Sequence, residues 1–314
     1  MIPALGICAV LRRIAGRAII ATLLLQSIVS PVRAWDSRTH EMITRLAVEA
    51  MPPSAFKTFL EQNLKMLEHL SVVPDSVLKQ RYGAAEKRRH YIDIDYYGSD
   101  DPFSQIDQSL KETESKFGAA NVERWGTLPW TIESVASHLG RRLTYSGHGN
   151  PDRRNCAAIL IMAGYLSHYV GDATQPLHTT SHYDGFAQDR GVHQRVEAVT
   201  DHEISRLAAH VAPQVQTITS VWSATILELR QSHALVMPLI EGDRAARAAS
   251  HDSVVSYERD LMKREGAMIT GQVSRAAALL ASIWMYEWQR AGRPALCPQV
   301  PQIHRRRSHK IIGA

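Results

Sequence analysis

The stretch DRRNCAAILIMAGYLSHYVGDATQPLH, residues 152–178 of this 314-residue chain, decides its fold. From Asp152 to Asp172 the segment is too hydrophobic for a helix that keeps one face in water. It therefore predicts a buried helix at the centre of a helical bundle. Pro176 ends the helical pattern, because proline has no backbone N–H to continue a helix.

Apolar residues recur at helical spacing on both sides of this central segment, and strands are hard to find. Helices are predicted near residues 42–50 and 56–67, with Pro52 and Pro53 between them and Ser54 as the cap of the second. Further helices are expected at about 193–211, 218–237 and 256–290. Helix stops are expected at Pro74, Pro102, Pro129, Pro151, Pro176 and Pro213. We predict one all-α domain, with loops at 81–101 and 175–191 near any functional site.

The first 34 residues have the three parts of a secretory signal. Three arginines lie between residues 12 and 17, an apolar run covers 18–25, and a small-residue site ends at Ala34. The apolar run is shorter than the roughly 20 residues that a membrane-spanning helix needs. We expect cleavage after Ala34 and export to the periplasm or the extracellular medium, with an uncleaved anchor as the alternative. The expected parts are a signal peptide at 1–34, a helical domain at 35–304 and a basic tail at 305–314.

The formal net charge of +5 is concentrated at the two ends of the chain. Four uncompensated positive charges lie in the first 34 residues and four in the last ten, so residues 35–304 carry −3. That charge gives no basic patch for tracking a polyanion. The basic end is typical of a solvated tail and can favour anionic surfaces. Cys156 and Cys297, the two cysteines beyond the signal, either form one disulfide or stay free.

Histidines and acids pair at helical spacing in and after the central segment. His168 and Asp172 are four residues apart, so their side chains leave the same face of a helix. His193 and Glu197 form a second such pair, and His178 follows Pro176. Imidazole and carboxylate, without cysteine, are the ligands expected for zinc in a catalytic site. Each pair alone also fits a hydrogen-bonded core or surface pair.

Taken together, these residues resemble the zinc-dependent phospholipase C and S1/P1 nuclease superfamily. Mature chains of that superfamily begin with Trp, and their central helix carries His-x-x-x-Asp followed by Gln-Pro-x-His. The matching elements here run in order as Trp35, His40, Asp75, His90, His168, Asp172, His178, His193 and Glu197. The resemblance covers residues 35–197 and implies the single multi-helix domain of that superfamily.

The resemblance also implies three zinc ions in a cleft. The first would be bound by Asp75, His90, His168 and Asp172, the second by His178, His193 and Glu197, and the third by His40, Asp172 and the amine and carbonyl of Trp35. Asp172 would then bridge two metals. Asp93 and Asp95, just beyond His90, are the rival assignments to Asp75.

The chemistry of such a site can be stated in general terms. An amine binds zinc only outside a peptide bond, so the third site requires removal of the residues before Trp35. Metals about 3.5–4 Å apart lower the pKa of a bridging water and neutralise charge on a phosphoryl group. The expected reaction is phosphodiester hydrolysis by in-line attack. Asp75 is the candidate catalytic residue, because it can orient or deprotonate the water.

The substrate implied by the resemblance depends on the branch. The interval from His178 to His193 is only 15 residues and the last acid is Glu197, which is similar to the phospholipase branch. Nuclease-like members usually carry a longer segment with Gly-Gly-Asn and Asn-Leu-His-x-x-Trp-Asp elements. Ser76 stands where choline-selective members place an aromatic residue, so the head group stays open. Candidate pocket aromatics are Tyr91, Tyr96, Tyr97, Tyr183 and Phe186.

We therefore expect a secreted tri-zinc phospholipase C whose substrate is a phospholipid head group at a membrane surface. The alternative is a single-strand nuclease or nucleotidase, with nucleic acid as its substrate. A hypothesis from another class is a secreted helical binding protein that keeps zinc for stability alone; an open coordination position separates the two kinds of zinc site. No protein partner is predicted.

Overall fold

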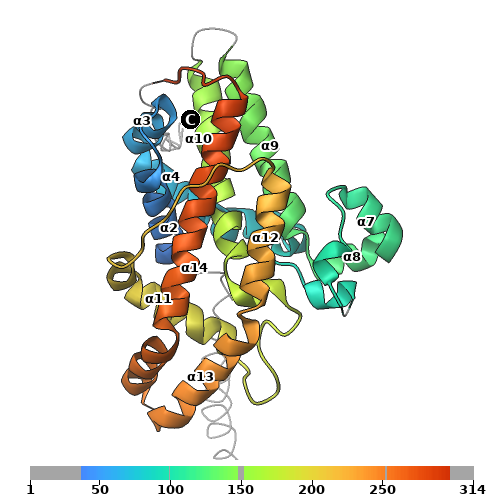
Figure 1. Ribbon diagram of the computed structural model, residues 1–314, viewed down its shortest axis with the longest axis vertical. Coiled ribbons are helices and arrows are strands. Elements are labelled where there is room, and N and C mark those ends of the chain that lie inside the picture. The colour runs from blue at the N-terminus through green and yellow to red at the C-terminus, as the bar shows by residue number, and fades with distance from the viewer. Residues whose placement is uncertain (1–36, 99, 148–151, 252, 298–314) are drawn as a thin grey trace, which may run out of the picture. The chain divides into compact units, whose positions relative to one another are not determined.

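The computed structural model describes residues 37–98, 100–147, 152–251 and 253–297. Within these residues every regular element is a helix, so the predicted all-α fold is confirmed (Figure 1). None of the described helices is both long enough and apolar enough to cross a membrane. The predicted signal peptide at 1–34, Trp35 and the basic tail at 305–314 all lie outside the described residues.

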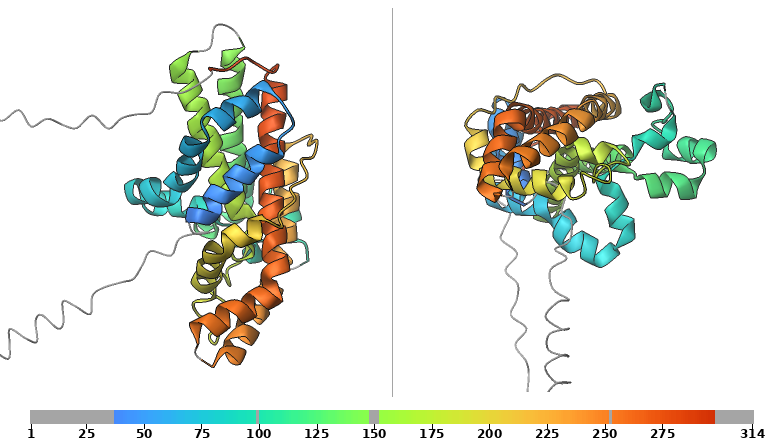
Figure 2. Two further views of the ribbon diagram at one scale, coloured as in Figure 1. Left: turned by 90° about the vertical axis from the view of Figure 1, so that its left-hand side faces the viewer. Right: turned by 90° about the horizontal axis from the view of Figure 1, so that it is seen from below.

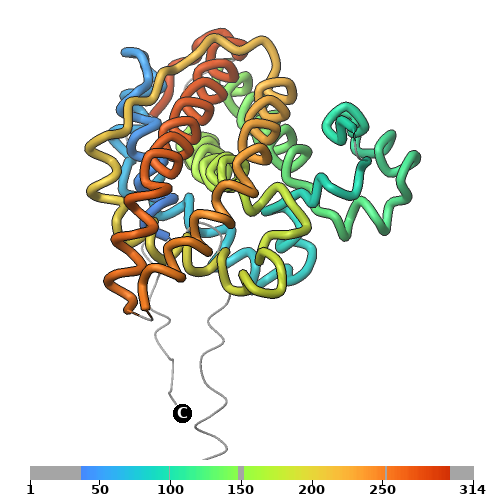
Figure 3. The backbone as a smooth tube through the Cα atoms, turned by 60° about the horizontal axis from the view of Figure 1, so that its bottom comes forward, coloured from blue at the N-terminus to red at the C-terminus, as the bar shows by residue number. Residues whose placement is uncertain are grey.

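The central helix is α10 (Arg153–Ala173), which matches the predicted segment to within one residue. It packs against α9 (Leu128–Ser146), α4 (Leu64–Val73), α14 (Val254–Arg290) and α2 (Ser37–Ala50) (Figures 2 and 3). Surrounded in this way, the helix buries side chains on every face, which explains its continuous apolar sequence.

Both ends of α10 follow from local chemistry. The Asp152 carboxylate accepts a hydrogen bond from the Arg154 N–H at 3.2 Å, which caps the first turn. At the other end the chain leaves the helix at Thr174, and Pro176 begins the 3₁₀ turn η5 (Pro176–Thr179). The metal-type residues of α10 therefore lie in its last two turns, next to η5.

The chain from α2 to α4 confirms the predicted break at Pro52 and Pro53 but contains a second break that was not predicted. Pro52 and Pro53 do separate α2 from α3 (Ala55–Gln62), and the Ser54 hydroxyl caps α3 by accepting from the Lys57 N–H at 3.1 Å. The single helix predicted near 56–67 is wrong, because the chain breaks between α3 and α4 at Asn63. The Asn63 side-chain amide donates to the Phe59 carbonyl at 2.8 Å and competes with the helix backbone.

Pro74 does not stop a helix, contrary to the sequence prediction. The chain continues from α4 into a π-helical turn, η1 (Pro74–Leu78), and then into α5 (Lys79–Tyr82). The Lys79 N–H bonds to the Pro74 carbonyl five residues back, so this turn widens instead of ending. Asp75 lies inside that widened turn.

The segment predicted as a loop at 81–101 contains several short helices. They are α6 (Ala84–Lys87), η2 (Arg88–His90) and η3 (Ile94–Tyr97). After them come η4 (Pro102–Ser104), α7 (Leu110–Phe117) and α8 (Ala119–Trp125), and the last two lie to one side of α9 and α12 (Figure 1). These short helices contain too few apolar residues to show the 3.6-residue spacing that identifies a helix in the sequence.

The C-terminal helices differ from prediction at one point. Instead of one helix over 218–237, the chain forms α12 (Val221–His233) and α13 (Val236–Ser250). Pro238 lies in the first turn of α13, where a missing N–H leaves no helix bond unmade. The helix predicted at 193–211 is α11 (Val192–Ala208), and the one predicted at 256–290 is α14, which begins two residues earlier.

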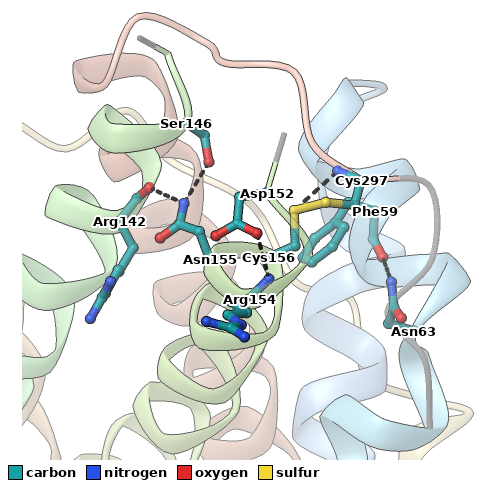
Figure 4. Close-up of a disulfide and its surroundings, with 9 residues drawn as sticks. All are labelled: Phe59, Asn63, Arg142, Ser146, Asp152, Arg154, Asn155, Cys156 and Cys297. Atoms are coloured by element: carbon teal, nitrogen blue, oxygen red, sulfur yellow. Dashed lines mark hydrogen bonds between the residues drawn. A yellow bond between two sulfur atoms is a disulfide. The ribbon is translucent and has the colours of Figure 1, made fainter. Parts of the chain in front are cut away.

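Cys156 and Cys297 form a disulfide with their Cα atoms 6.2 Å apart. The bond joins the first turn of α10 to the segment that follows α14, and the Cys297 N–H also donates to the Cys156 sulfur at 3.2 Å (Figure 4). The bond closes a covalent loop over a sequence separation of 141 residues. Such a cross-link stabilises a fold mainly by restricting the unfolded chain. The sequence left this pairing open.

Candidate metal centre

Three groups of histidine and acidic side chains lie among the described residues, and within each group the potential ligand atoms are within 4.8 Å of one another. The groups are His40, His168 and Asp172; Asp75, His90 and His168; and His178, His193 and Glu197. The structure thus brings together eight of the nine predicted metal residues. The ninth, Trp35, lies outside the described residues.

These side chains come from six separate elements. The i, i+4 spacing puts two of them on one face of α10, and the same spacing puts two on one face of α11. The others come one each from α2, η1, η2 and η5. The helix pairs are therefore set by local geometry, whereas the four single residues depend on how the elements pack.

The Asp172 carboxylate lies at the junction of the groups and is fully buried. Its Oδ2 is 2.9 Å from His90 Nδ1 and 3.3 Å from His168 Nε2. Its Oδ1 is 3.6 Å from His40 Nε2 and 3.5 Å from His178 Nδ1. One carboxylate thus faces four imidazoles, as expected for a residue shared between metals.

Backbone carbonyls orient two of the imidazoles. His168 Nδ1 donates to the Ser71 carbonyl at 2.7 Å, and His178 Nδ1 donates to the His90 carbonyl at 2.7 Å. In these tautomers each Nε2 carries a lone pair that points into the centre. His168 Nε2 lies 2.9 Å from His90 Nδ1, and His178 Nε2 lies 3.1 Å from His193 Nε2.

Ring nitrogens this close either share a neutral N–H···N hydrogen bond or bind a common cation. Burial holds the pKa of His40, His90 and His178 below its ordinary value, so these imidazoles are neutral and keep a lone pair for a metal. Several buried atoms also make no hydrogen bond to any described residue, among them both ring nitrogens of His40, Asp172 Oδ1 and Glu197 Oε2. Buried polar atoms are normally paired, so these residues fit a metal ion. Nitrogen and oxygen donors without thiolate fit zinc.

The three carboxylates of the centre differ in their electrostatics. Burial opposes ionisation of Asp75, but the charge and hydrogen bond of His168, with Lys79, hold its pKa well below the ordinary value. Burial, then the charge of Asp75, raises the pKa of Asp172 well above the ordinary value. Burial also opposes ionisation of Glu197, and His193 and His178 outweigh it and lower its pKa. A bound cation would therefore relieve Asp172 most.

Three residues that contact the candidate metal ligands were not assigned a role from the sequence: Glu86, Gln175 and Gly171. Glu86 is buried in α6, accepts a hydrogen bond from the Tyr169 hydroxyl and lies with Oε1 3.6 Å from His90 Nε2. Its position four residues before His90 is the signal that could have identified it. The roles of Gln175 and Gly171 require the tertiary structure.

Gln175 and Gly171 act on opposite sides of the centre. Gln175 Nε2 donates to Glu197 Oε1 at 2.9 Å, while its Oε1 accepts from the Leu177 N–H at 2.6 Å. A Cβ at Gly171 would come within 2.9 Å of His40 Nδ1, so the close approach of α2 to α10 requires glycine there.

The rival acids Asp93 and Asp95 belong to none of the three groups. Asp95 Oδ2 accepts from the Thr180 hydroxyl at 2.7 Å and from the Ser181 N–H at 2.6 Å, so it holds the loop after η5. Burial, with the charge of Asp95, raises the pKa of Asp93 to about 7. Among the three candidates, only Asp75 lies beside His90 and His168.

The five candidate aromatic residues divide into two kinds. Tyr183 is 51% exposed, and its ring centre lies 5.9 Å from that of His193, at the edge of the third group. Tyr91 lies close enough to Tyr183 for the two phenols to interact electrostatically, and its hydroxyl donates to the Arg124 carbonyl at 3.1 Å. The other three pack on neighbouring rings: Tyr96 and Tyr97 on Trp125, and Phe186 on His182.

Comparison with known proteins gives matches of two kinds. The sequence profile described as S1/P1 Nuclease matches residues 35–203. Endonuclease 1 of Arabidopsis thaliana is 27% identical over 174 residues, which are 54% of this chain and 50% of that protein. This chain therefore matches about half the length of that curated relative.

Two solved structures are also similar. The alpha toxin from Clostridium absonum has a TM-score of 0.48 at 16% identity and covers 84% of this chain and 66% of its own. The Clostridium perfringens alpha-toxin isolated from avian strain SWCP has a TM-score of 0.45 at 14% identity, with 83% and 65% covered.

Proposed function

We propose, from the premise that this chain belongs to the S1/P1 nuclease family, that it is an exported, zinc-dependent enzyme that cleaves single-stranded nucleic acid. Family and relative support the coarser statement that the protein is a phosphodiester hydrolase. The observation that carries the proposal is the convergence of eight histidine and acidic side chains in one buried centre.

The residues that would hold zinc are those predicted from the sequence. Asp75, His90, His168 and Asp172 would hold one ion, His178, His193 and Glu197 another, and His40 with Asp172 and Trp35 a third. Bound zinc supplies a hydroxide nucleophile at neutral pH and stabilises charge on the phosphoryl oxygens. An open coordination position would distinguish this centre from a purely structural one.

The chain itself contributes an ionised carboxylate at a fixed position. Asp75 is held in the π turn by its ion pair with Lys79, four residues later. Because its pKa is held low, Asp75 stays ionised at neutral pH and can accept a hydrogen bond from the attacking water. The ammonium of Lys79 lies on the same helical face, where it favours an anionic substrate.

Two observations favour a nucleic acid as the substrate. The family and the curated relative are both named as nucleases. The half-exposed Tyr183 places a phenol ring beside His193, and aromatic faces bind unstacked bases.

A second candidate, phospholipase C, is favoured by one specific observation. The interval between His178 and His193 is short, and Glu197 is the closing acid. These features led to the phospholipid prediction, and they favour a glycerophospholipid as the alternative substrate.

One experiment separates these functions. The same exported preparation is incubated with single-stranded DNA, phosphatidylcholine and phosphatidylethanolamine, before and after dialysis against a chelator. We expect release of nucleotides that chelator abolishes and zinc restores. Release of diacylglycerol without nucleotides would assign phospholipase C instead, and hydrolysis that chelator leaves unchanged would reject metal dependence. Bound zinc without any hydrolysis would favour the helical binding protein.

A further inference from the structure

The segment between α11 and α12, residues 209–220, crosses α14, and we call it the strap (Figure 1). It is fixed at two points: the Gln216 N–H donates to the Ser282 hydroxyl at 2.9 Å, and the Tyr286 hydroxyl donates to the Thr219 carbonyl at 3.2 Å. Between the strap, α12 and α14 lies a cavity of about 380 Å³. This size is in the range of small-molecule sites.

The lining of this strap cavity combines polar and apolar side chains and carries two charged ones, Glu228 and Arg275. Three primary amides face it, from Gln214, Gln216 and Gln231, together with the hydroxyl side chains of Thr217 and Ser223. Amides and hydroxyls both donate and accept hydrogen bonds. Small and aliphatic side chains, including Ala224, Ala278 and Leu279, provide an apolar wall. A ligand that suits this lining has groups that both donate and accept hydrogen bonds, and it also has an apolar face.

Glu228 gives the cavity a fixed acceptor. The side chain is only 9% exposed, and its Oε1 takes all of its observed partners: Arg275 Nε at 3.1 Å, Arg275 Nη2 at 3.0 Å and the Ser232 hydroxyl at 3.3 Å. These contacts leave out the second oxygen, Oε2. A carboxylate oxygen of this kind can accept hydrogen bonds from a ligand.

A hydrogen-bond network holds Glu228 in place. Gln272 Nε2 donates to the Ser232 hydroxyl at 3.1 Å and also to the Thr174 carbonyl just after α10. Because Ser232 in turn donates to Glu228, the acceptor is anchored to the central helix. The carboxylate is therefore preorganised for a ligand instead of being free to reorient.

The two charged side chains of the cavity balance each other. Arg275 compensates the negative charge of Glu228, so neither a cation nor an anion gains much attraction there. A neutral molecule with several hydroxyl groups does not depend on such attraction, and its hydroxyls can pair with the amides and with Glu228.

We propose that the strap cavity is a binding site for a saccharide. The sugar hydroxyls pair with the amides and with Glu228, and the C–H face of the ring packs on Ala278 and Leu279. None of the eight metal-type residues lines this cavity, so the site is separate from the metal centre. The inference does not depend on the proposed nuclease activity.

The test is isothermal titration of the full, zinc-loaded protein with glucose, N-acetylglucosamine and maltose. Inorganic phosphate and spermidine serve as charged probes. Ser223 lies at the exposed rim of the cavity, so Ser223→Trp fills the cavity from outside without changing the core. Met237→Trp makes an equally bulky change at an exposed position outside the cavity. Circular dichroism establishes that both variants are folded.

We expect saturable binding of at least one saccharide, weakened by about tenfold or more in Ser223→Trp. Binding should be unchanged in Met237→Trp. Gln231→Ala, which removes one amide from the rim, should weaken binding by a smaller factor. Absence of saccharide binding, binding of phosphate or spermidine alone, or saccharide binding that survives Ser223→Trp would each overturn the proposal.

Discussion

Two clusters in this molecule contain buried carboxylates, and they differ in how the negative charge of those carboxylates is compensated. In the metal centre, burial and then the charge of Asp75 raise the pKa of Asp172, and its Oδ1 makes no hydrogen bond to a described residue. The second cluster joins α13 to the loop that precedes α11. There the Asp189 carboxylate accepts hydrogen bonds from Arg244 Nε at 2.8 Å and from Arg244 Nη2 at 2.9 Å. Asp243 accepts from Arg195 Nη2 at 2.6 Å and from the Tyr257 hydroxyl at 2.7 Å.

The difference shows how a structural cluster can be distinguished from a functional one. The arginine cluster carries its own counter-charges, and each of its two carboxylates is paired with a guanidinium. The histidine cluster leaves ring nitrogens and a carboxylate oxygen without hydrogen-bond partners among the described residues, which are the atoms that a bound cation would pair. Variants in the two clusters should therefore fail in different ways.

The largest effect is expected for Asp172→Asn, which removes the carboxylate shared by two of the proposed zinc ions. Hydrolysis of a chromogenic phosphodiester should fall by roughly a thousandfold, because bound metal contributes several kcal/mol to the transition state. Zinc per chain, measured by mass spectrometry, should fall as well. The metal-free variant should unfold at the same urea concentration as the metal-free parent or a higher one. Full zinc content with unimpaired hydrolysis would contradict the bridging role.

Asp243→Asn should show the opposite behaviour. It leaves Arg195 and Tyr257 without their charged partner, and removing one member of a largely buried ion pair costs about 3 kcal/mol. Urea unfolding should reveal this loss, while zinc content at low temperature should be unchanged. Loss of zinc from the folded variant would mean that the two clusters are not independent.

Gln175→Ala tests whether the hydrogen bond that orients Glu197 contributes to zinc affinity. The variant removes the hydrogen bond to Glu197 Oε1, and partners of this kind typically contribute about tenfold or more to metal affinity. Competition with a zinc-binding dye should show weakening of one zinc ion. Gln231→Ala is the matched control, because its amide lies at the strap cavity, away from the centre. Equal zinc affinity in the two variants would remove Gln175 from the supporting set.

Asp93 is a partly buried acid for which the structure provides neither an arginine nor a metal group. Burial and Asp95 raise its pKa from 3.8 to about 7, so the folded state binds its proton more tightly than the unfolded state does. Its contribution to stability is therefore present in full below pH 3.8 and is lost as the pH rises towards 7. Asp93→Asn should be more stable than the parent above pH 7, by about 1–2 kcal/mol, and the difference should shrink towards pH 4. A constant difference across this range, measured by urea unfolding, would contradict the raised pKa.

The sequence predicts the parts of this fold that depend on local rules. The central helix and the His168–Asp172 and His193–Glu197 pairs follow from helical spacing alone, and the Ser54 cap follows from its side chain. The fold class also follows, because apolar spacing is helical over most of the chain.

The remaining features depend on tertiary packing or on exceptions to local rules. The carbonyl of Ser71 orients His168 across 97 residues of sequence, and no local pattern indicates that contact. Pro74 was interpreted as a helix stop, but the chain continues through it from α4 into a π turn although proline has no N–H to donate to the preceding turn. Pro238 lies in the first turn of α13, where a missing N–H leaves no helix bond unmade. The spacing of Glu86 from His90 was a local signal, but the hydrogen bond that it accepts from Tyr169, 83 residues later, was visible only in the structure.

The π turn at Pro74 affects how insertions and deletions during evolution can alter this centre. Such a turn is equivalent to an α-helix with one inserted residue, and each residue of an α-helix rotates the chain by about 100°. Deleting Ser76 would therefore convert the π turn to an α turn, keep the phase of the helical residues on either side, and bring Gln80, instead of Lys79, four positions after Asp75. A single insertion or deletion in this turn thus exchanges the side chain that meets a proposed metal ligand while leaving the ligand itself in place.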